Sequence, residues 1–274
     1  MCKIVIQLDY QEILPPPLLK DYVKCFWILE DKNSAQGQVD RILPDGCMEL
    51  IFHFGDHFNR YFSKKSEKQP RSFLFGQLTT FIQIGPSGKT GIIAARFYPH
   101  GANAFLNFPV SEITNHSVDI RSLFGIEGGE LEERIITANT NPERIQTLQD
   151  FLIKKLCQYR KDDTVIKECI REITATKGDI KIESLSQNLN ISQRQLERKF
   201  ASTVGLNPKY LGRIIRFNNI FKLVQKKEIN SLTMLSHESG YYDQAHFIRD
   251  FKQFTGLNPK VYFRGEHSLS KLFV

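Results

Sequence analysis

The chain has 274 residues, of which 41% are hydrophobic and 24% charged, and it carries a formal net charge of +7. This composition is typical of a globular protein with about two domains, and it excludes wholesale disorder. No stretch approaches the roughly 18 uncharged apolar residues that cross a membrane, and the first apolar run meets Asp9 before it reaches signal-peptide length.

The cysteines are widely spread and form no CxxC motif, which argues against a disulfide framework and against a zinc site. They are Cys2, Cys25, Cys47, Cys157 and Cys169. We therefore expect free thiols in a cytoplasmic protein, with no metal and no cofactor.

The first 110 residues predict a β-rich domain. Short runs of aromatic and β-branched residues are separated by turn sequences such as LPDG, GPSG and YPHG. The runs are FWILE (26–30), MELIFHF (48–54), RSFLFGQ (71–77), FIQIG (81–85) and GIIAARF (91–97). MELIFHF alternates, with Leu50, Phe52 and Phe54 on one face. Many short, closely spaced strands predict a small sandwich or barrel.

From about Pro109 the pattern becomes helical. Helical segments are expected around Ser117–Phe124, at GGELEERIITA, and at Pro142–Tyr159, where apolar residues recur at helical spacing. The last of these helices either packs on the β-rich domain or mediates dimerisation. The polar stretch Arg160–Asp163 predicts the linker between a domain 1–160 and a domain 164–265, whose first helix Thr164 can cap.

Two histidines of the β-rich domain raise the question of a metal. His53 and His57 flank a Gly-Asp pair, and Glu49 shares the strand face of His53. A cupin-like metal site needs several histidines and a carboxylate that converge inside a barrel. The spacing is not the His-x-His of that motif, so we interpret both histidines as surface or rim residues.

Two further features of this domain have alternative interpretations. Arg96 lies in an apolar strand, where it either clamps an anionic effector or pairs with a carboxylate such as Asp45 or Glu49. The segment Gly85–Lys89 (GPSGK) lacks the full spacing of a phosphate-binding loop, and we interpret it as a hairpin turn.

The pentapeptide GLNPK occurs twice, at Gly205–Lys209 and at Gly256–Lys260, 51 residues apart. At this offset RKFASTVGLNPK aligns with RDFKQFTGLNPK, and upstream the best offset is 50. The extra residue falls in a turn between two helices. The chain therefore contains one structural unit twice, at about 182–204 and 232–255. In each copy the glycine ends a helix in a left-handed conformation, the asparagine caps the next helix, and the proline occupies its first turn.

Each unit is a helix, a tight turn and a second helix, which is the helix-turn-helix arrangement of DNA-binding proteins. Residues 165–274 carry 18 Lys and Arg against 10 Asp and Glu, a charge of +8, whereas residues 1–164 carry −1. A basic excess confined to the helical part favours a polyanionic partner.

At these residues the chain resembles the AraC/XylS family of transcription regulators. The segment GYYDQAHFIRDFKQFTGLNPKVYFR, from Gly240 to Arg264, is similar to the carboxyl-terminal pattern of that family, with small departures at Ala245 and Asn258. Segments 43–56 and 91–125 resemble, more loosely, the region that precedes such domains in some members. The resemblance implies two helix-turn-helix units joined by a linker helix at about 208–226, and an α+β chain overall.

The outward faces of the two second helices supply the expected DNA contacts. Counting from the buried apolar residues gives the outward stripe of the first unit, and adding 51 gives that of the second. The expected base contacts are Gln193, Arg194, Glu197, Arg198, Gln244, Ala245, His246 and Arg249. The expected phosphate contacts are Ser192, Lys199, Lys209, Lys252 and Lys260.

The sequence thus predicts a sequence-specific, double-stranded-DNA-binding regulator that is not an enzyme. By analogy with the family, the amino-terminal domain senses a small molecule or mediates homodimerisation, and an activator would also contact RNA polymerase. Two alternatives stay open: an architectural protein that binds DNA without specificity, and an enzyme with a cupin-like amino-terminal active site.

Overall fold

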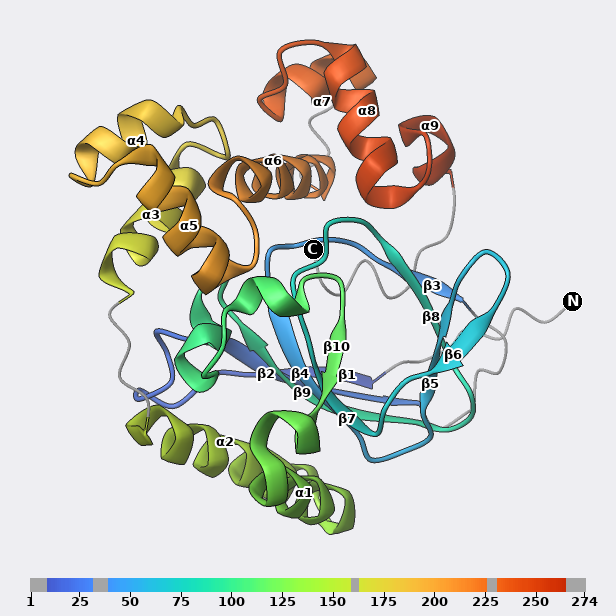
Figure 1. Cartoon of the computed structure of the whole chain (residues 1–274). Coiled ribbons are helices and arrows are strands. Elements are labelled where there is room, and N and C mark those ends of the chain that lie inside the picture. Colours follow the sequence, from blue (N-terminus) through green and yellow to red (C-terminus); the bar gives the residue numbers. More distant parts are fainter. Residues whose placement is uncertain (1–8, 32–38, 159–162, 226–230, 265–274) are drawn as a thin grey trace, which may run out of the picture.

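The computed structural model describes residues 9–31, 39–158, 163–225 and 231–264 (Figure 1). A β-sandwich covered by two helices forms the amino-terminal part, and the carboxyl-terminal part is helical throughout, so the fold is α+β as predicted. Arg160 to Asp162 of the predicted linker, and residue 226 at the end of the predicted linker helix, lie outside the described residues. No helix of the described segments has the length and apolarity that would let it cross a membrane.

The sandwich has two antiparallel sheets that do not close into a barrel (Figure 1). The larger sheet has the strand order β1-β2-β9-β4-β7-β10, and the smaller has the order β3-β8-β5-β6. The strands are β1 (Asp9–Ile13), β2 (Val23–Asp31), β3 (Asp40–Ile42), β4 (Met48–His53), β5 (Phe58–Tyr61), β6 (Ser66–Lys68), β7 (Ser72–Phe75), β8 (Ile82–Pro86), β9 (Thr90–Phe97) and β10 (Ser117–Asp119).

The larger sheet is buried on both faces. Leu50 and Phe52 of β4 join the core beneath α1 (Ile120–Thr137) and α2 (Asn141–Gln158), while Ile51 packs toward the smaller sheet. His53 points the same way as Ile51 and is only 1% exposed, so its predicted surface or rim position is wrong. The reason is that the smaller sheet covers the face that we expected to meet solvent.

All five predicted strands are present, as β2, β4, β7, β8 and β9. The short strands β1, β3, β5, β6 and β10 were not predicted, and β10 lies where we expected a helix at Ser117. The Gly85–Lys89 turn does not close a hairpin within one sheet, because β8 pairs with β3 and β5 while β9 pairs with β2 and β4. Two 3-10 turns, η1 (Gly101–Phe105) and η2 (Val110–Ile113), connect β9 to β10.

The helix predicted at Pro142–Tyr159 is α2, and its apolar side packs on the sandwich, as one of the two interpretations required. Ile145, Leu148 and Leu152 are buried there, in the same core as the larger sheet. Helix α1 is kinked at Gly125, where φ is 60°.

Seven helices form the described carboxyl-terminal part. They are α3 (Thr164–Ala175), α4 (Ile182–Asn188), α5 (Gln193–Val204), α6 (Pro208–Gln225), α7 (Leu232–Glu238), α8 (Gln244–Thr255) and α9 (Pro259–Tyr262). The capping position before α3 belongs to Asp163 and not to Thr164, and the Asp163 carboxylate accepts a hydrogen bond from Asn103 Nδ2 of η1 at 3.2 Å.

The two GLNPK joints have the predicted construction. Gly205 ends α5 with φ of 83°, and Gly256 ends α8 with φ of 73°, both in the left-handed region. Asn258 accepts a hydrogen bond from the Lys260 amide, and the prolines begin α6 and α9. Each joint thus stops one helix and starts the next.

Both joints lie against the β-sandwich part of the chain. Thr114, just after η2, donates a hydrogen bond to the Gly205 carbonyl at 2.7 Å. The Phe81 ring lies directly on the Gly256 backbone. Leu43, which follows β3, is buried in the helical core together with Leu211. The helix-turn-helix units are therefore packed on the sandwich and not suspended from a linker.

The packing of the second joint can be tested with two glycines that share a left-handed backbone, Gly240 and Gly256. Alanine at Gly240, where φ is 83° and nothing lies near the new methyl group, should cost only backbone strain of about 1–2 kcal/mol in the free energy of unfolding. Gly256→Ala should cost about 1–3 kcal/mol more, because the methyl group would overlap the Phe81 ring. Chemical unfolding of the variants measures both.

The same experiment has an internal control. In a Phe81→Ala background the excess cost of Gly256→Ala over Gly240→Ala should disappear, since no ring then opposes the methyl group. An excess that persists without the ring would show that the second joint is not packed on Phe81.

Candidate functional site

The second helix of the first unit, α5, has a well-capped amino terminus. Ser192 accepts from the Gln195 amide, and the Gln195 side chain returns to the Ser192 amide, which is a complete capping box. Leu196, Phe200 and Val204 are fully buried. The four predicted base-contacting side chains of this helix are all exposed: Gln193, Arg194, Glu197 and Arg198.

The second helix of the second unit, α8, is built in the same way. Asp243 caps it by accepting a hydrogen bond from the His246 amide at 2.7 Å. Of the predicted base contacts, Gln244, Ala245 and Arg249 are exposed. His246 is half-buried, with its ring edge-on to Tyr241 and its Nε2 atom 3.7 Å from the Asp250 carboxylate. It is therefore the least available of the eight predicted base contacts.

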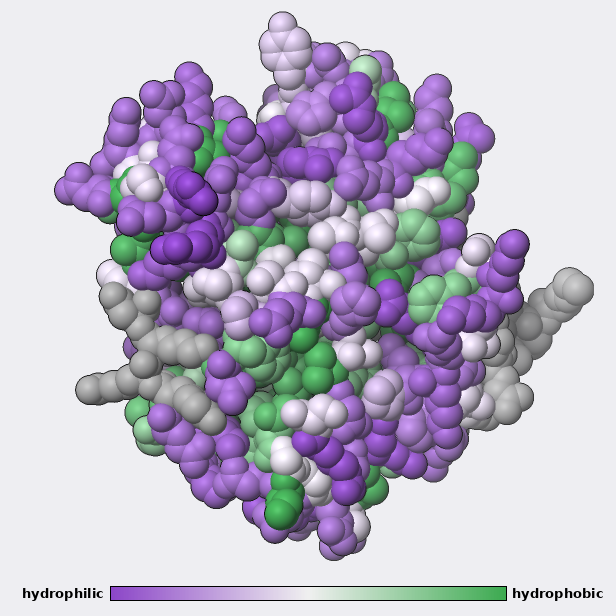
Figure 2. Space-filling model, in the orientation of Figure 1, coloured by the Kyte–Doolittle hydropathy of each residue, from purple (hydrophilic) through white to green (hydrophobic). Residues whose placement is uncertain are grey.

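The predicted phosphate contacts fall into two groups by position. Ser192 and Lys199 lie on or beside α5, with Lys199 half-buried, and Lys252 lies exposed on α8. Lys209 and Lys260 are exposed at the joints, beyond the carboxyl ends of the two recognition helices. Figure 2 shows mainly hydrophilic residues over the carboxyl-terminal helices at the top of the molecule.

An ion pair that the sequence reasoning missed fixes α8 on α6. Asp250 is 1% exposed, and Arg213 of α6 donates to its two carboxylate oxygens at 2.7 and 3.3 Å. Arg213 also donates to Gln253 Oε1 at 2.6 Å. The repeat contained a signal for this pair, because Lys199 stands at the equivalent position of the first unit, so only the second unit carries an acid on its inner face.

Tyr242 was also missed as a surface feature. Its side chain is 89% exposed in the turn before α8, whereas its neighbour Tyr241 is buried. The doubled tyrosine of this turn is the sequence signal that could have pointed to one inward and one outward ring. The exposed ring stands next to the amino-terminal end of α8.

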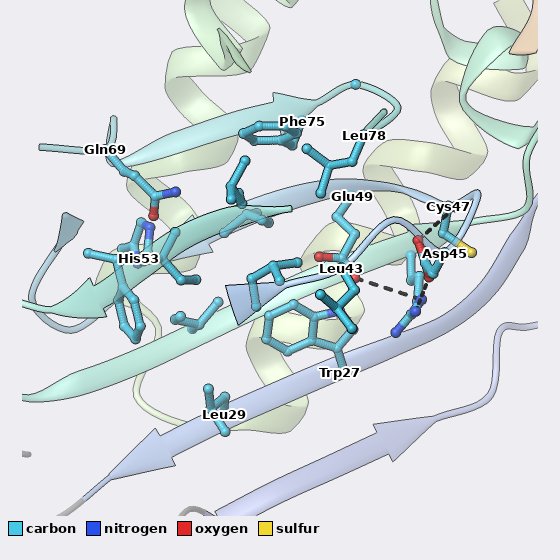
Figure 3. Close-up of a pocket in the computed structure, with 18 residues that line it drawn as sticks. Trp27, Leu29, Leu43, Asp45, Cys47, Glu49, His53, Gln69, Phe75 and Leu78 are labelled. Atoms are coloured by element: carbon cyan, nitrogen blue, oxygen red, sulfur yellow. Dashed lines mark hydrogen bonds and ion pairs between the residues drawn. The ribbon is translucent and has the colours of Figure 1, made fainter. Parts of the chain in front are cut away.

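A cavity of about 80 Å³ lies between the two sheets (Figure 3). Most of its walls are apolar, and the polar groups are gathered at two ends: His53 and Gln69 at one, Asp45 and Cys47 at the other. The lining residues are Trp27, Leu29, Ile42, Leu43, Asp45, Cys47, Glu49, Ile51, His53, Phe58, Gln69, Phe75, Gly76, Leu78, Ile82, Ile84, Ile92 and Arg96.

Arg96, for which an effector contact was one of two interpretations, is buried beside this cavity and is paired with carboxylates. It forms an ion pair with Asp45, and its Nε atom lies 3.8 Å from Glu49 on the neighbouring strand. Burial acts to raise the pKa of Asp45, but the charge of Arg96 and the Cys47 amide outweigh it, so that pKa lies below its usual value. The second interpretation of Arg96, pairing with Asp45 and Glu49, is thus confirmed.

Glu49 has a different balance. Burial raises the pKa of its carboxyl group to about 7, against the lowering effect of Arg96. Trp27 Nε1 donates a hydrogen bond to its carboxylate at 3.1 Å. Arg96 is therefore shared by two carboxylates, and it stabilises the ionised form of Asp45 more than that of Glu49.

His53 is the polar group at the other end of the cavity. The Gln69 side chain lies beside the ring as a hydrogen-bonding neighbour that acts to raise the pKa of His53, but within the described residues no group meets either ring nitrogen with full hydrogen-bonding geometry. Burial, reinforced by the neighbouring His57, lowers the pKa of His53 to about 3, so the ring is neutral. His57 itself is engaged with the Gln69 carbonyl at 2.8 Å.

The described residues contain no group of three or more His, Cys, Asp or Glu side chains that could hold a metal ion. His53 and His57 lie side by side, with 6.1 Å between their ring centroids, but Glu49 is engaged at the other end of the cavity. The arrangement therefore offers a binding cavity with hydrogen-bonding groups at its ends.

Two family models match the chain. Residues 185–265 match a helix-turn-helix domain, and residues 11–119 match a domain of unknown function (DUF6597). No curated protein matches the chain.

Several solved structures resemble the fold at low identity. ToxT from Vibrio cholerae is 11% identical, with a TM-score of 0.46, over 83% of this chain and 97% of that one. A second ToxT structure, from strain SCE256 and bound to an unsaturated fatty acid, is 12% identical, with a TM-score of 0.42, over 86% and 94% of the two chains. The carboxyl-terminal domain of AraT, a response regulator from Geobacillus stearothermophilus, is 24% identical, with a TM-score of 0.35, over 38% and 87%.

The buried, neutral state of His53 predicts a specific loss of stability in acid. Because the folded-state pKa of about 3 lies below the ordinary value near 6.5, the unfolded chain binds the proton more tightly, and the free energy of unfolding falls as the pH drops below about 6.5. Between pH 7 and pH 5 this group should account for a loss of about 2 kcal/mol. His53→Phe should remove that share.

Urea unfolding at the two pH values, followed by the emission of the single tryptophan Trp27, measures the difference. His237→Phe, at an exposed position, is the matched control and should leave the acid sensitivity unchanged. Equal acid sensitivity of the wild type and His53→Phe would contradict a neutral, buried His53.

Proposed function

The chain is an AraC/XylS-type transcription regulator that binds DNA through its helix-turn-helix domain, and we propose that it reads one operator with two recognition helices, α5 and α8. In this proposal the two helices enter successive major grooves on the same side of the duplex, roughly one helical turn apart.

The observation that carries this proposal is the matching exposure of the two helix amino termini. Each helix is capped at its first turn, is buried along its inner face, and presents a free outer face beginning at Gln193 or Gln244. In Figure 1 the carboxyl ends of α5 and α8 point toward the sandwich, so the amino-terminal halves point away from it. A duplex can therefore approach both helices from the side opposite to the sandwich.

The two helices carry different chemistry for base recognition. α5 presents Arg194, Glu197 and Arg198, which suit hydrogen bonds to guanine and from cytosine. α8 presents Ala245, which offers only apolar contact with a thymine methyl group, and Arg249, which is equivalent to Arg198. We therefore assign more of the sequence specificity to the first unit.

Of the predicted phosphate contacts, Ser192, Lys199 and Lys252 lie on or beside the recognition helices and would meet the phosphate backbone, whereas Lys209 and Lys260 lie at the joints on the sandwich side and are less favoured. The Ser192 hydroxyl already belongs to the capping box. We therefore expect the amino terminus of α5 as a whole, with its backbone N–H groups, to face a phosphate, and not the hydroxyl alone. A regulator of this kind acts in the cytoplasm of a bacterial cell, and it would contact RNA polymerase if it is an activator.

Of the two alternatives, non-specific architectural binding is disfavoured by the outward polar side chains at the positions that reach base edges. Regulators of this type are not enzymes. The exposed arginines on both recognition helices distinguish specific from non-specific binding experimentally, because they should matter on one sequence and much less on others.

The amino-terminal sandwich would regulate DNA binding through the cavity between its sheets. A cavity with apolar walls and a few polar groups is the usual form of a small-molecule site. The buried His53, which has only the Gln69 side chain beside its ring and no hydrogen bond of full geometry among the described residues, is the group that a ligand would satisfy. A homodimer formed through the sandwich part is compatible with this role.

Selection of bound DNA from a random pool should yield a gapped motif with two elements about 10 base pairs apart. The element read by α5 should be the more sharply defined. A single continuous element, or no enrichment at all, would contradict two helices in successive grooves.

Arg198→Ala and Arg249→Ala should each weaken binding to the selected sequence by about 1–3 kcal/mol, with much less effect on random DNA. Arg134→Ala, an exposed arginine of α1, removes the same charge far from the recognition helices and should change neither. Equal losses on selected and random DNA would reduce these arginines to phosphate contacts.

A further inference from the structure

The charges at the cavity set what it can accept. Arg96 is the cation among its lining residues, and it is already paired with Asp45 and lies near Glu49. A ligand anion would enter beside two carboxylates without a free cation to balance it, and an ion left unpaired in an apolar site is costly. A ligand cation would also lose its water in a cavity that is mainly apolar.

An uncharged ligand meets neither penalty. Its apolar part would contact Trp27, Ile51 and Ile84, while one hydroxyl-type group could use the neutral His53 ring, which can donate at one nitrogen and accept at the other. The raised pKa of Glu49 is a further argument against an anionic ligand, because burial and the nearby Asp45 already disfavour negative charge at this carboxyl group.

The cavity is so small that one of its walls must move when a ligand enters. A cavity of about 80 Å³ is roughly half the size of an engineered cavity that holds benzene, so a ligand of about that size must push a wall outward. The strands cannot yield easily, because their ladders bond them to neighbours on both sides in the centre of each sheet. Three connections between strands complete the walls. The β3–β4 connection is held through the ion pair of Asp45 with Arg96, and Gln69, between β6 and β7, is held through its carbonyl on His57. The third is the segment 76–81 between β7 and β8, from which Gly76 and Leu78 line the cavity, and we take it as the wall that yields.

The next three residues of this segment contact the helix-turn-helix part. The Tyr210 hydroxyl donates to the Thr79 carbonyl at 2.7 Å, and the Thr80 hydroxyl donates to the Gln253 carbonyl at 2.8 Å. Phe81 lies on Gly256. The first residues of the segment 76–81 thus form part of the cavity wall, and its last three residues contact the helix-turn-helix part.

Hydrogen bonds continue from this segment to α8. Gln253 Nε2 donates to the Tyr210 hydroxyl at 2.9 Å, while Arg213 donates to Gln253 Oε1 and to the buried Asp250. Tyr210 and Arg213 belong to α6, and Asp250 and Gln253 belong to α8. A shift of Thr79 would therefore disturb the hydrogen bonds of Tyr210 and Gln253, which help to orient α8, the second recognition helix.

We propose that the cavity takes a small, uncharged, mainly apolar molecule bearing one hydrogen-bonding group, and that its entry displaces the segment 76–81 and so changes the placement of α8. The proposal rests on the assignment of the cavity as the effector site. The unit that responds to the ligand is the second helix-turn-helix and not the first.

The ligand class is tested on the full chain with three probes of similar size that share a phenyl ring and differ in charge: benzyl alcohol, benzoate and benzylammonium. Trp27, the single tryptophan, lines the cavity, so its emission reports occupancy directly. Benzyl alcohol should bind saturably and at least tenfold more tightly than either ion, and His53→Phe should weaken it at least tenfold. A charged probe that binds as tightly, or no saturable binding by any probe, overturns the assignment.

The transmission is tested by measuring affinity for the selected DNA with and without saturating benzyl alcohol. The wild type should change at least threefold. Tyr210→Phe, which loses both hydrogen bonds of the hydroxyl, should bind the probe normally but lose most of this response. Tyr98→Phe makes the same change at a surface tyrosine of the sandwich part and should keep the full response.

A full response in Tyr210→Phe, or no response in the wild type despite probe binding, would refute the role of the segment 76–81. Either result leaves the proposed operator recognition intact, because the gapped motif and the arginine variants are measured without any probe. Loss of the motif itself would instead refute the proposed mode of DNA binding.

Discussion

Each recognition helix ends in a glycine whose backbone lies against the β-sandwich, and this close approach determines where the two helices stand. Only a residue without a side chain can both adopt the left-handed conformation that stops the helix and let Phe81 lie on it. Thr114 makes the corresponding contact with Gly205. The joint that ends a helix is thus also the surface by which the DNA-binding part is mounted.

The smaller sheet of the sandwich is needed for this arrangement. Without the smaller sheet, Trp27, Ile51 and His53 would face water, and no enclosed space would exist behind the segment that carries Phe81. The two sheets enclose a small volume, and the loop that closes it is also the loop that meets α6 and α8. One wall of the cavity and the mounting of the second unit therefore share one strand connection, between β7 and β8.

Much of this architecture could be predicted from the sequence, because it depends on local signals. The repeated pentapeptide fixes the helix ends through glycine, asparagine and proline, whose preferences act within a few residues. The five strands that carry aromatic or β-branched runs were equally clear. The short strands were not, since β3, β6 and β10 have three residues each and exist only because a neighbouring strand pairs with them.

The features that escaped prediction all depend on contacts between distant segments. His53 looked like a surface residue because alternation along β4 says nothing about a second sheet. Asp250 looked like an ordinary helix residue, although Arg213, 37 positions earlier, pairs with it. Leu43 follows a strand of the sandwich yet belongs to the helical core. Such pairings arise from tertiary packing, to which periodicity is blind.

The hydrogen bond between Asn103 and Asp163 is the first of three attachments between the helical part and the sandwich. The helical part is attached to the sandwich at its beginning by Asp163, near its middle by Gly205, and toward its end by Gly256 and Gln253. If the last attachment is released, the first two still hold, so α5 would stay in place while α8 could shift together with α6, to which Arg213 and Asp250 hold it. Such a hinge would alter the spacing between two DNA half-sites that the protein tolerates, and it would leave the grip on one of them unchanged.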